Sequence, residues 1–209
     1  FVRTRLSRAL HVKRLKTGHA GTLDPLATGV LILCTGKKTK LIEQLQHHDK
    51  QYVATLQLGA TTPSFDLEKP IDAHYPTEHI NLTLIEHTLP RFVGGIQQIP
   101  PIFSAVKVDG KRAYSIARQG KEAELKPKNI NISQIQILDF NADLMQLTLQ
   151  IDCSKGTYIR ALARDIGQAL NSGAHLIALR RTRLGDITVD DCITFEQLQD
   201  MLNNTSKQI

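Results

Sequence analysis

The sequence predicts an α+β domain built on a mixed, mostly antiparallel sheet. Three stretches alternate apolar and polar residues as half-buried strands do, at residues 50–60, 129–140 and 143–153. Residues 154–173 instead repeat their apolar residues with helical spacing. Helices and strands do not follow one another in a regular βαβ rhythm, which favours this class. With 209 residues, 41% of them hydrophobic, the chain can form one domain with a substantial core.

Helical spacing predicts helices at residues 3–16, 37–49, 77–94, 154–173 and 194–202. Thr77 is the candidate N-cap of the helix at 77–94, which Pro90 should interrupt, and Thr157 is the candidate N-cap of the helix at 154–173. The apolar stripe of this last helix consists of Ile159, Leu162, Ala163, Ile166 and Leu170. Gly173 lies just past its end, where helices commonly stop.

Two further strands and one unusual segment complete the expected elements. The strands cover residues 30–34 and 175–185. Residues 96–128 combine a Pro-Pro break, a short strand pair around the Asp109-Gly110 turn and a small basic helix. This composition predicts a hairpin-like lobe beside the core.

Positive charge is concentrated in four segments of the chain, although the net charge is only +6. Residues 1–16, 37–40, 107–128 and 155–183 hold 22 of the 26 Lys and Arg residues but only four of the 20 acidic residues. These segments sum to +18 and the rest of the chain to −12. Such segregation indicates a surface that meets a polyanion, with a merely solvated surface as the alternative.

The composition also narrows the cellular setting. No apolar run approaches the roughly 18 residues that a membrane span needs, so we expect no membrane contact. Three widely spaced cysteines form neither a disulfide framework nor a metal site and suggest the reducing cytoplasm. The chain starts with Phe1 rather than Met, so we expect its natural N-terminus to be longer.

The stretch GHAGTLDPLATGVL, residues 18–31, surrounds Asp24 with glycines and a proline. Asp-Pro is common in ordinary turns, where the carboxylate bonds nearby backbone N–H groups. Glycines, however, allow close approach of backbone to backbone or ligand, and Pro25 fixes the geometry after the carboxylate. Because a misplacement of about 1 Å is costly in catalysis, a rigid loop also suits a catalytic carboxylate.

Three other residue types are candidates for the same site. Arg160 lies in the first turn of the helix at 154–173 and Arg164 one turn later, and neither belongs to the apolar stripe. Each could hold a carboxylate bidentately, bind RNA phosphate, or simply form an exposed basic face. Tyr52 is either strand packing or a ring that stacks on a nucleobase and offers its hydroxyl. His19 is either a loop residue with local hydrogen bonds or a contact to an extruded base.

Several established chemistries lack their motifs. The sequence contains no P-loop, no dinucleotide-binding glycine fingerprint and no G-x-S-x-G elbow. No His, Cys and Asp residues have metal-ligand spacing. We therefore expect chemistry that needs neither a cofactor nor a metal.

Four stretches closely resemble the bacterial tRNA pseudouridine(55) synthases of the TruB family. They are GHAGTLDPLATGVLILCTGKKTK, KQYVATLQLGA, IPPIFSAVKVDGKRAYSIARQG and CSKGTYIRALARDIG with the following GAHLIALRRTRLG. The resemblance implies the pseudouridine synthase fold and isomerisation of the T-loop uridine of tRNA. It implies catalytic roles for Asp24, Tyr52 and Arg160, with Arg160 as the arginine that pairs with Asp24. It further implies substrate contacts by Gly18, His19, Lys155, Arg164, Leu179 and Arg181.

The resemblance also implies an organisation for the chain. Residues 1–209 would be the catalytic domain with an incomplete N-terminus, and residues 99–130 would be an RNA-gripping thumb. We expect no separate C-terminal RNA-binding domain, no required protein partner and a monomer bound to the tRNA T-arm. The family often has T-D-T-x-D after the tyrosine strand, whereas this chain has TTPSFD, so the role of Asp66 stays open.

The residues fit this reaction, in which one glycosidic bond is exchanged for another without redox chemistry. A carboxylate beside the anomeric carbon is the device that glycosidases use. Extracting the uridine from its stack costs a few kcal/mol, which phosphate binding by the basic segments would offset. Two alternatives remain: an RNA-binding folding chaperone without turnover, and a nucleoside or glycoside hydrolase that uses Asp24 with a second acid.

Overall fold

The computed structural model describes residues 1–104, 107–108, 111–112 and 125–205. Its long strands are β4 (Lys50–Leu58), β10 (Lys128–Asn141), β11 (Gln146–Cys153) and β12 (Ala174–Leu184). Its short strands are β1 (Thr17–His19), β2 (Ala27–Gly29), β3 (Leu33–Thr35), β5 (Ala60–Thr61), β6 (Ala73–His74), β7 (Gly94–Gln98), β8 (Lys107–Val108), β9 (Lys111–Arg112) and β13 (Ile187–Thr188). Its α-helices are α1 (Val2–Ala9), α2 (Ile42–His47), α3 (Leu82–Thr88), α5 (Ile159–Ala169) and α6 (Phe195–Thr205), and its 3₁₀ helices are η1 (Gly36–Leu41), η2 (Leu89–Phe92) and η3 (Val189–Asp191).

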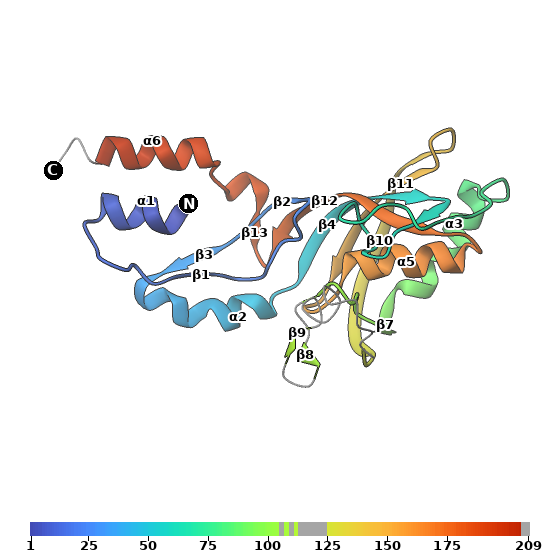
Figure 1. Ribbon diagram of the computed structural model, residues 1–209, viewed down its shortest axis with the longest axis horizontal. Helices are drawn as coiled ribbons and strands as arrows, with labels where there is room; N and C mark the ends of the chain where they lie inside the picture. The colour runs from blue at the N-terminus through green and yellow to red at the C-terminus, as the bar shows by residue number, and fades with distance from the viewer. Residues whose placement is uncertain (105–106, 109–110, 113–124, 206–209) are drawn as a thin grey trace.

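The central sheet has the strand order β13-β12-β4-β11-β10-β7, and β2 pairs beside β12 (Figure 1). The pairings along this order are antiparallel, and only that of β2 with β12 is parallel within the described residues. The prediction of an α+β fold with a mixed, mostly antiparallel sheet is confirmed.

The core lies between this sheet and helix α5. Buried and half-buried residues alternate along β4, so that Tyr52, Ala54 and Leu56 share one buried face. The apolar stripe predicted for the helix is buried, from Ile159 at 4% exposed to Ile166 at 0%. Burying one such large aliphatic side chain contributes about 1.5–3 kcal/mol, so this contact fixes α5 on the sheet.

Most of the predicted elements are present, but several have different bounds. The helix predicted at 37–49 is η1 followed by α2, and the helix predicted at 77–94 is α3 followed by η2. The helix predicted at 3–16 ends at Ala9, and His11 and Arg14 have left-handed φ angles of 50° and 57°. The apolar residues of this stretch do not continue one face, because Leu10 and Val12 are two residues apart and would point about 160° away from each other on a helix. Of the strand predicted at 30–34, only Leu33 and Cys34 are in a strand, β3, and residues 30–32 connect it to β2. Gly29 turns the chain there, because β2 and β3 pair with different strands.

Both predicted helix caps are wrong. Helix α3 begins after Asn81, whose side chain accepts a hydrogen bond of 2.9 Å from the Leu84 N–H, and not after Thr77. Helix α5 has Tyr158 at its N-cap without a side-chain cap, and the Thr157 hydroxyl donates instead to the Ser154 carbonyl. Each prediction placed the start of the helix too early.

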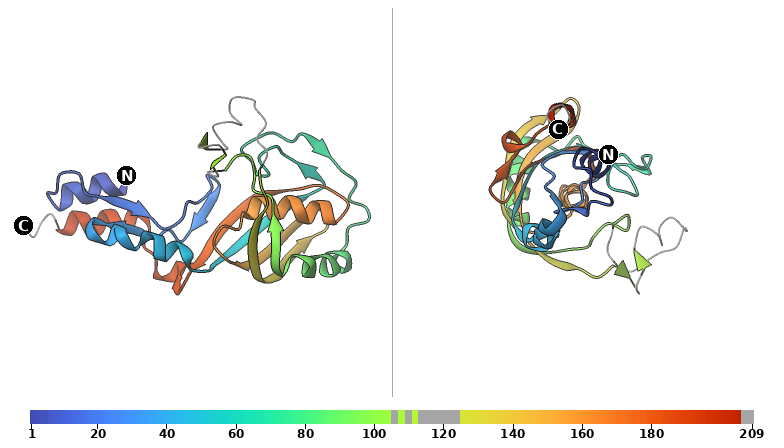
Figure 2. Two further views of the ribbon diagram at one scale, coloured as in Figure 1. Left: turned by 90° about the horizontal axis from the view of Figure 1, so that it is seen from below. Right: turned by 90° about the vertical axis from the view of Figure 1, so that its left-hand side faces the viewer.

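The lobe predicted at residues 96–128 contains the expected strand pair. Strands β8 and β9 pair antiparallel and stand out from the sheet (Figure 2). The expected turn at Asp109-Gly110 and the small basic helix lie outside the described residues.

The molecule is elongated, with its terminal helices at one end. Helices α1, α2 and α6 lie together at that end, whereas α3 and α5 lie against the sheet at the other (Figures 1 and 2). Phe1 and Phe195 pack edge to face at 5.4 Å between ring centroids and join α1 to α6. Among the described helices, none combines the length and the apolar character that crossing a bilayer would require.

Candidate active site

The loop between β1 and β2 carries Asp24 and is fastened to strand β12. The Arg181 side chain, 1% exposed, donates from Nε to the Val30 carbonyl at 2.8 Å and from Nη2 to the Gly21 carbonyl at 3.2 Å. The Val30 N–H in turn donates to the Arg181 carbonyl at 2.8 Å. The loop therefore has a fixed backbone on both sides of Asp24, as a catalytic carboxylate requires.

Gly29 shows why this loop needs glycine. Its φ is +97°, and a Cβ built there would lie 2.1 Å from the Arg181 carbonyl oxygen. Any other residue would have to push β2 away from β12. The close backbone approach expected from the glycines is confirmed at this position.

Asp24 and Arg160, which are 136 residues apart in the chain, form an ion pair. The Arg160 Nη2 donates to the Asp24 Oδ1 at 2.9 Å. The arginine side chain is 6% exposed and the aspartate side chain 29%. The guanidinium thus binds one carboxylate oxygen from the interior of the protein, while the carboxylate is partly exposed to solvent.

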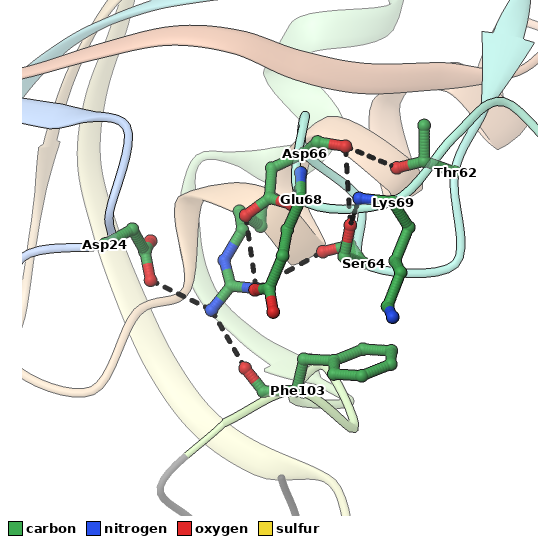
Figure 3. A network of polar contacts seen from close by, with 8 residues as sticks. Asp24, Thr62, Ser64, Asp66, Glu68, Lys69 and Phe103 are labelled. Carbon is green, nitrogen blue, oxygen red and sulfur yellow. Dashed lines mark hydrogen bonds and ion pairs between the residues drawn. The ribbon is translucent and has the colours of Figure 1, made fainter. Parts of the chain in front are cut away.

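The Arg160 guanidinium is held by several further acceptors, which belong to the labelled residues Ser64, Asp66 and Phe103 in Figure 3. Nη2 also donates to the Phe103 carbonyl at 3.0 Å, and Nη1 donates to the Ser64 carbonyl at 3.3 Å. Nη1 lies 3.4 Å from Asp66 Oδ2. One cation therefore joins the Asp24 loop, the segment before β8 and the loop after β5.

Asp66 is the second carboxylate of this cluster, and its side chain is 1% exposed. Its Oδ1 accepts from the Glu68 N–H at 2.9 Å, and its carbonyl accepts from the Thr62 hydroxyl at 2.7 Å (Figure 3). Removing a buried charge from such a pair leaves the other charge uncompensated, so Asp66 and Arg160 depend on each other. The role that the sequence left open is that of a partner of Arg160.

Tyr52 lies on β4 beside this cluster. It is directly opposite Arg181 of β12 in the strand register and is 8% exposed. Burial raises the pKa of Tyr52, while the positive charge of Arg181 and its hydrogen bond to the phenol oppose the rise, and the charge of Asp24 adds weakly to it. The phenol therefore keeps its proton at neutral pH and sits within the electrostatic reach of Asp24.

The six other predicted substrate contacts lie in three kinds of position: exposed, buried beneath the Asp24 loop, or engaged within the protein. His19 is exposed at the end of β1, and Lys155 is exposed with its Nζ 3.2 Å from His47 Nε2. Leu179 is 6% exposed and pairs with Ala27 of β2, so it packs beneath the Asp24 loop.

Three predicted contacts are instead engaged with the protein itself. Gly18 serves packing, because a Cβ built on it would lie only 2.5 Å from Ile42 Cδ1. Arg164 donates to Asp165 and to the Ile99 carbonyl and lies 4.9 Å from the centroid of the Phe65 ring. Arg181 fastens the Asp24 loop through the hydrogen bonds to its backbone.

Three groups beside Arg160 were missed by sequence reasoning. Tyr158 directly precedes α5, and burial raises its pKa, with Arg160 opposing the rise and Asp24 adding to it. Its signal was its position two residues before Arg160. The carbonyl oxygens of Ser64 and Phe103 carry no signal at all, because every residue has one.

Two protein-family models together match most of the chain. That of the TruB family pseudouridylate synthase N-terminal domain matches residues 7–159, and that of the tRNA pseudouridylate synthase B C-terminal domain matches residues 160–208. The chain belongs to the TruB family. The boundary between the two TruB matches falls at Arg160, so the ion pair joins a residue from each matched region.

Curated TruB relatives extend along nearly all of the chain. It is 61% identical over 202 residues to a tRNA pseudouridine synthase B of Phocaeicola vulgatus, covering 97% of this chain and 85% of the relative. It is 50% identical to a protein of the same name from Flavobacterium johnsoniae, covering 91% and 82%.

Solved structures show the same fold. A Cbf5-Nop10-Gar1 complex gives a TM-score of 0.68 with 28% identity over 95% of this chain, and an H/ACA RNP bound to a substrate RNA containing 2'-deoxyuridine gives 0.65 with 26% identity over 97%. The chain spans about half of the length of these solved chains, 49% and 48% respectively. The pseudouridine synthase fold expected from the sequence is confirmed.

Proposed function

We propose that this protein converts the T-loop uridine of tRNA, position 55, into pseudouridine. The observation that carries the proposal is the ion pair of Asp24 with Arg160, at 2.9 Å, in a member of the TruB family. The pair presents a partly exposed carboxylate from a fastened loop, and the name of the curated relatives gives tRNA as their substrate.

The proposed reaction balances without an added reactant. The bond between N1 of the uracil and C1′ of the ribose breaks, the base turns, and C5 bonds to C1′. The C5 proton is released and N1 gains a proton. Asp24 acts at the anomeric carbon, where a carboxylate stabilises the positive charge that develops as the bond breaks.

We propose that the neighbouring residues position and shield the base. Arg160 orients Asp24, and Asp66 orients Arg160. The Tyr52 ring stacks on the extruded uracil and its protonated hydroxyl supplies a hydrogen bond at the edge of the base. Buried surroundings keep water from the reactive intermediate, which would otherwise lose its base by hydrolysis.

The remaining contacts are proposed from their positions. His19 and Lys155 are exposed and would meet RNA, whereas Gly18, Leu179 and Arg181 would act through the packing of the Asp24 loop. Arg164 would meet RNA only after exchanging its bond to Asp165. The lobe within residues 99–130 would grip the T-arm.

We further propose a monomer that acts in the cytoplasm without a protein partner. One chain supplies the whole Asp24 cluster, and the structure contains Cys34, Cys153 and Cys192 as free thiols, which fits a reducing compartment.

Release of tritium tests the proposal directly. A tRNA transcript labelled at uridine C5 should lose label to water with the wild-type protein, and only from position 55. Asp24→Asn should abolish the release while thermal unfolding stays within a few degrees. Asp165→Asn is the matched control, because it neutralises the carboxylate of another Arg–Asp pair on the same helix and should keep most of the activity.

Each alternative gives a different result. Tight tRNA binding without any release by the wild-type protein would identify an RNA chaperone. Free uracil as the product would identify a hydrolase. Full activity in Asp24→Asn would reject the assignment of the catalytic residue.

A further inference from the structure

A second strongly charged region lies away from the Asp24 cluster. Helix α1 and residues 10–17 enclose a groove of about 910 Å³. Five of its lining residues carry a positive side chain, and none carries a negative one; the five are Arg3, Arg8, Lys13, Arg14 and Lys16.

The cations of this groove have no acidic partner in the described part of the chain. The ion pairs formed there involve Arg160, Arg164 and Arg183 only. Helix α1 has no buried residue, so these side chains are not needed for a core either. A concave surface lined by one sign of charge focuses the electrostatic potential and attracts polyanions.

The local backbone holds these cations around the groove. After α1 ends, the Val12 N–H donates to the Ser7 carbonyl at 3.0 Å and turns the chain back along the helix. His11 and Arg14 adopt left-handed φ angles in this return. Further on, the Gly36 N–H donates to the Lys16 carbonyl at 2.8 Å, so the lysines of η1 follow directly on the groove.

The groove is also within reach of an RNA that occupies the proposed active site. Asp24 lies eight positions after Lys16, and an extended chain covers at most about 29 Å over that length. Phosphates follow one another at roughly 3.4 Å along the axis of a duplex, so about eight of them span this distance. One base-paired arm can therefore touch both places.

We propose that this groove binds backbone phosphates of the tRNA away from the target nucleotide. The inference rests on the proposed function for the identity of the RNA. Phosphate contacts of this type fix the position of the RNA and are independent of base sequence. An RNA backbone fits better than an anionic membrane, because the charged surface is concave and the Phe1 ring is packed against Phe195.

The test is a double substitution, Arg8→Ala with Lys13→Ala, compared with Gln136→Glu with Asn141→Asp. Both double variants lower the net charge by two, but the control positions are exposed residues of β10 in the central sheet. For the groove variant we expect KM for the tRNA transcript to rise on the order of tenfold while kcat is unchanged. The plot of log Kd against log salt should lose about 1.8 units of slope, the value for two phosphate contacts on a duplex.

A charge-preserving variant and a vesicle-binding measurement make the result decisive. Arg8→Lys with Lys13→Arg keeps both charges and should restore the wild-type KM and slope. A groove variant that matches the control in KM and salt slope, or that lowers kcat at unchanged KM, would overturn the proposal. Binding of the wild-type protein to phosphatidylserine vesicles, lost in the groove variant while tRNA binding is kept, would also overturn it.

The outcome separates this inference from the proposed reaction. If the wild-type protein releases no tritium but the groove variant still weakens tRNA binding with a reduced salt slope, the groove stands and the reaction is wrong. If tritium is released and the groove variant behaves as the control, the reaction stands and the groove is wrong.

Discussion

Arginine serves two different purposes at the two ends of this molecule. In the Asp24 cluster, Arg160 and Arg181 are 5% and 1% exposed and are held by carbonyl and carboxylate oxygens of the protein. In the groove beside α1, Arg3 and Arg8 are exposed. A buried guanidinium fixes the position of other groups, so its loss should damage the fold and the site together. An exposed one adds only charge, which salt can screen.

The largest effect is expected from Arg160→Leu, which leaves the buried carboxylate of Asp66 unpaired. The free energy of unfolding should fall by about 3–5 kcal/mol, measured by urea denaturation. Arg164→Leu breaks a more exposed pair and should cost about 1 kcal/mol or less.

The double variant Arg160→Leu with Asp66→Asn identifies the cause of that loss. Because it removes the stranded charge as well, it should be more stable than Arg160→Leu alone. Equal stability of the two variants would show that lost packing, and not the unpaired carboxylate, causes the damage.

Two glycine substitutions compare how tightly the backbone is packed in the Asp24 loop and beside the groove. Gly29→Ala must place a Cβ against the backbone of Arg181, whereas Gly36→Ala, also at positive φ, meets nothing within 4 Å. We expect Gly36→Ala to cost about 1 kcal/mol from φ alone and Gly29→Ala to cost about 2 kcal/mol more. Thermal unfolding of the two variants measures the difference. Similar melting temperatures would mean that β2 moves away from β12 at little energetic cost.

The predictability of the two regions from sequence also differs. The strand alternation of β4 and the stripe of α5 follow from local pattern, and both were predicted correctly. The pairing of Asp24 with Arg160 was left open by the residues, because nothing local joins positions 136 residues apart; the family resemblance implied it. Asp66 lacked even that support, since TTPSFD departs from the family pattern.

The errors have local physical causes as well. The end of α1 was missed because a basic sequence with two leucines four apart is compatible with a longer helix, and its exposed residues give no packing signal. The strand predicted at 30–34 was misplaced because β2 pairs with β12 and β3 pairs with β1, and such pairing is a property of the assembled sheet.

Alkaline pH should weaken the buried sheet through Cys153, which is 1% exposed on β11. Burial raises the pKa of this thiol to about 12 from an ordinary value of 9.0. Between these values the unfolded chain loses the proton and the folded chain keeps it, so stability falls as pH rises through that window.

At pH 10.5 this loss amounts to about 2 kcal/mol relative to neutral pH. Cys153→Ala should remove that part of the pH dependence, whereas Cys192→Ala, at an exposed position, should leave it in place. Urea denaturation at pH 7 and pH 10.5 measures the free energy of unfolding at each pH. If Cys153→Ala loses as much stability between the two pH values as the wild type does, the assignment to this thiol is wrong.

A smaller effect is expected from Asp66→Asn, measured on kcat instead of stability. Asparagine keeps the shape and can still accept from the Glu68 N–H, but it no longer attracts the Arg160 guanidinium. Tritium release should slow about tenfold at saturating tRNA, equal to about 1.4 kcal/mol of transition-state stabilisation, with KM nearly unchanged. A rise in KM at constant kcat would instead assign Asp66 to tRNA binding.

The smallest effect on the fold is expected in the groove. Arg8→Ala with Lys13→Ala removes two exposed charges from a part of the chain without buried residues, so unfolding should change by less than about 0.5 kcal/mol. Raising salt should then narrow the gap in tRNA affinity between this variant and the wild type, because salt weakens every phosphate contact and the wild type makes two more of them. The defect of Arg160→Leu should persist at every salt concentration, since its partners are buried. A groove variant that unfolds as readily as Arg160→Leu would mean that these cations support the fold and would remove the distinction between the two ends.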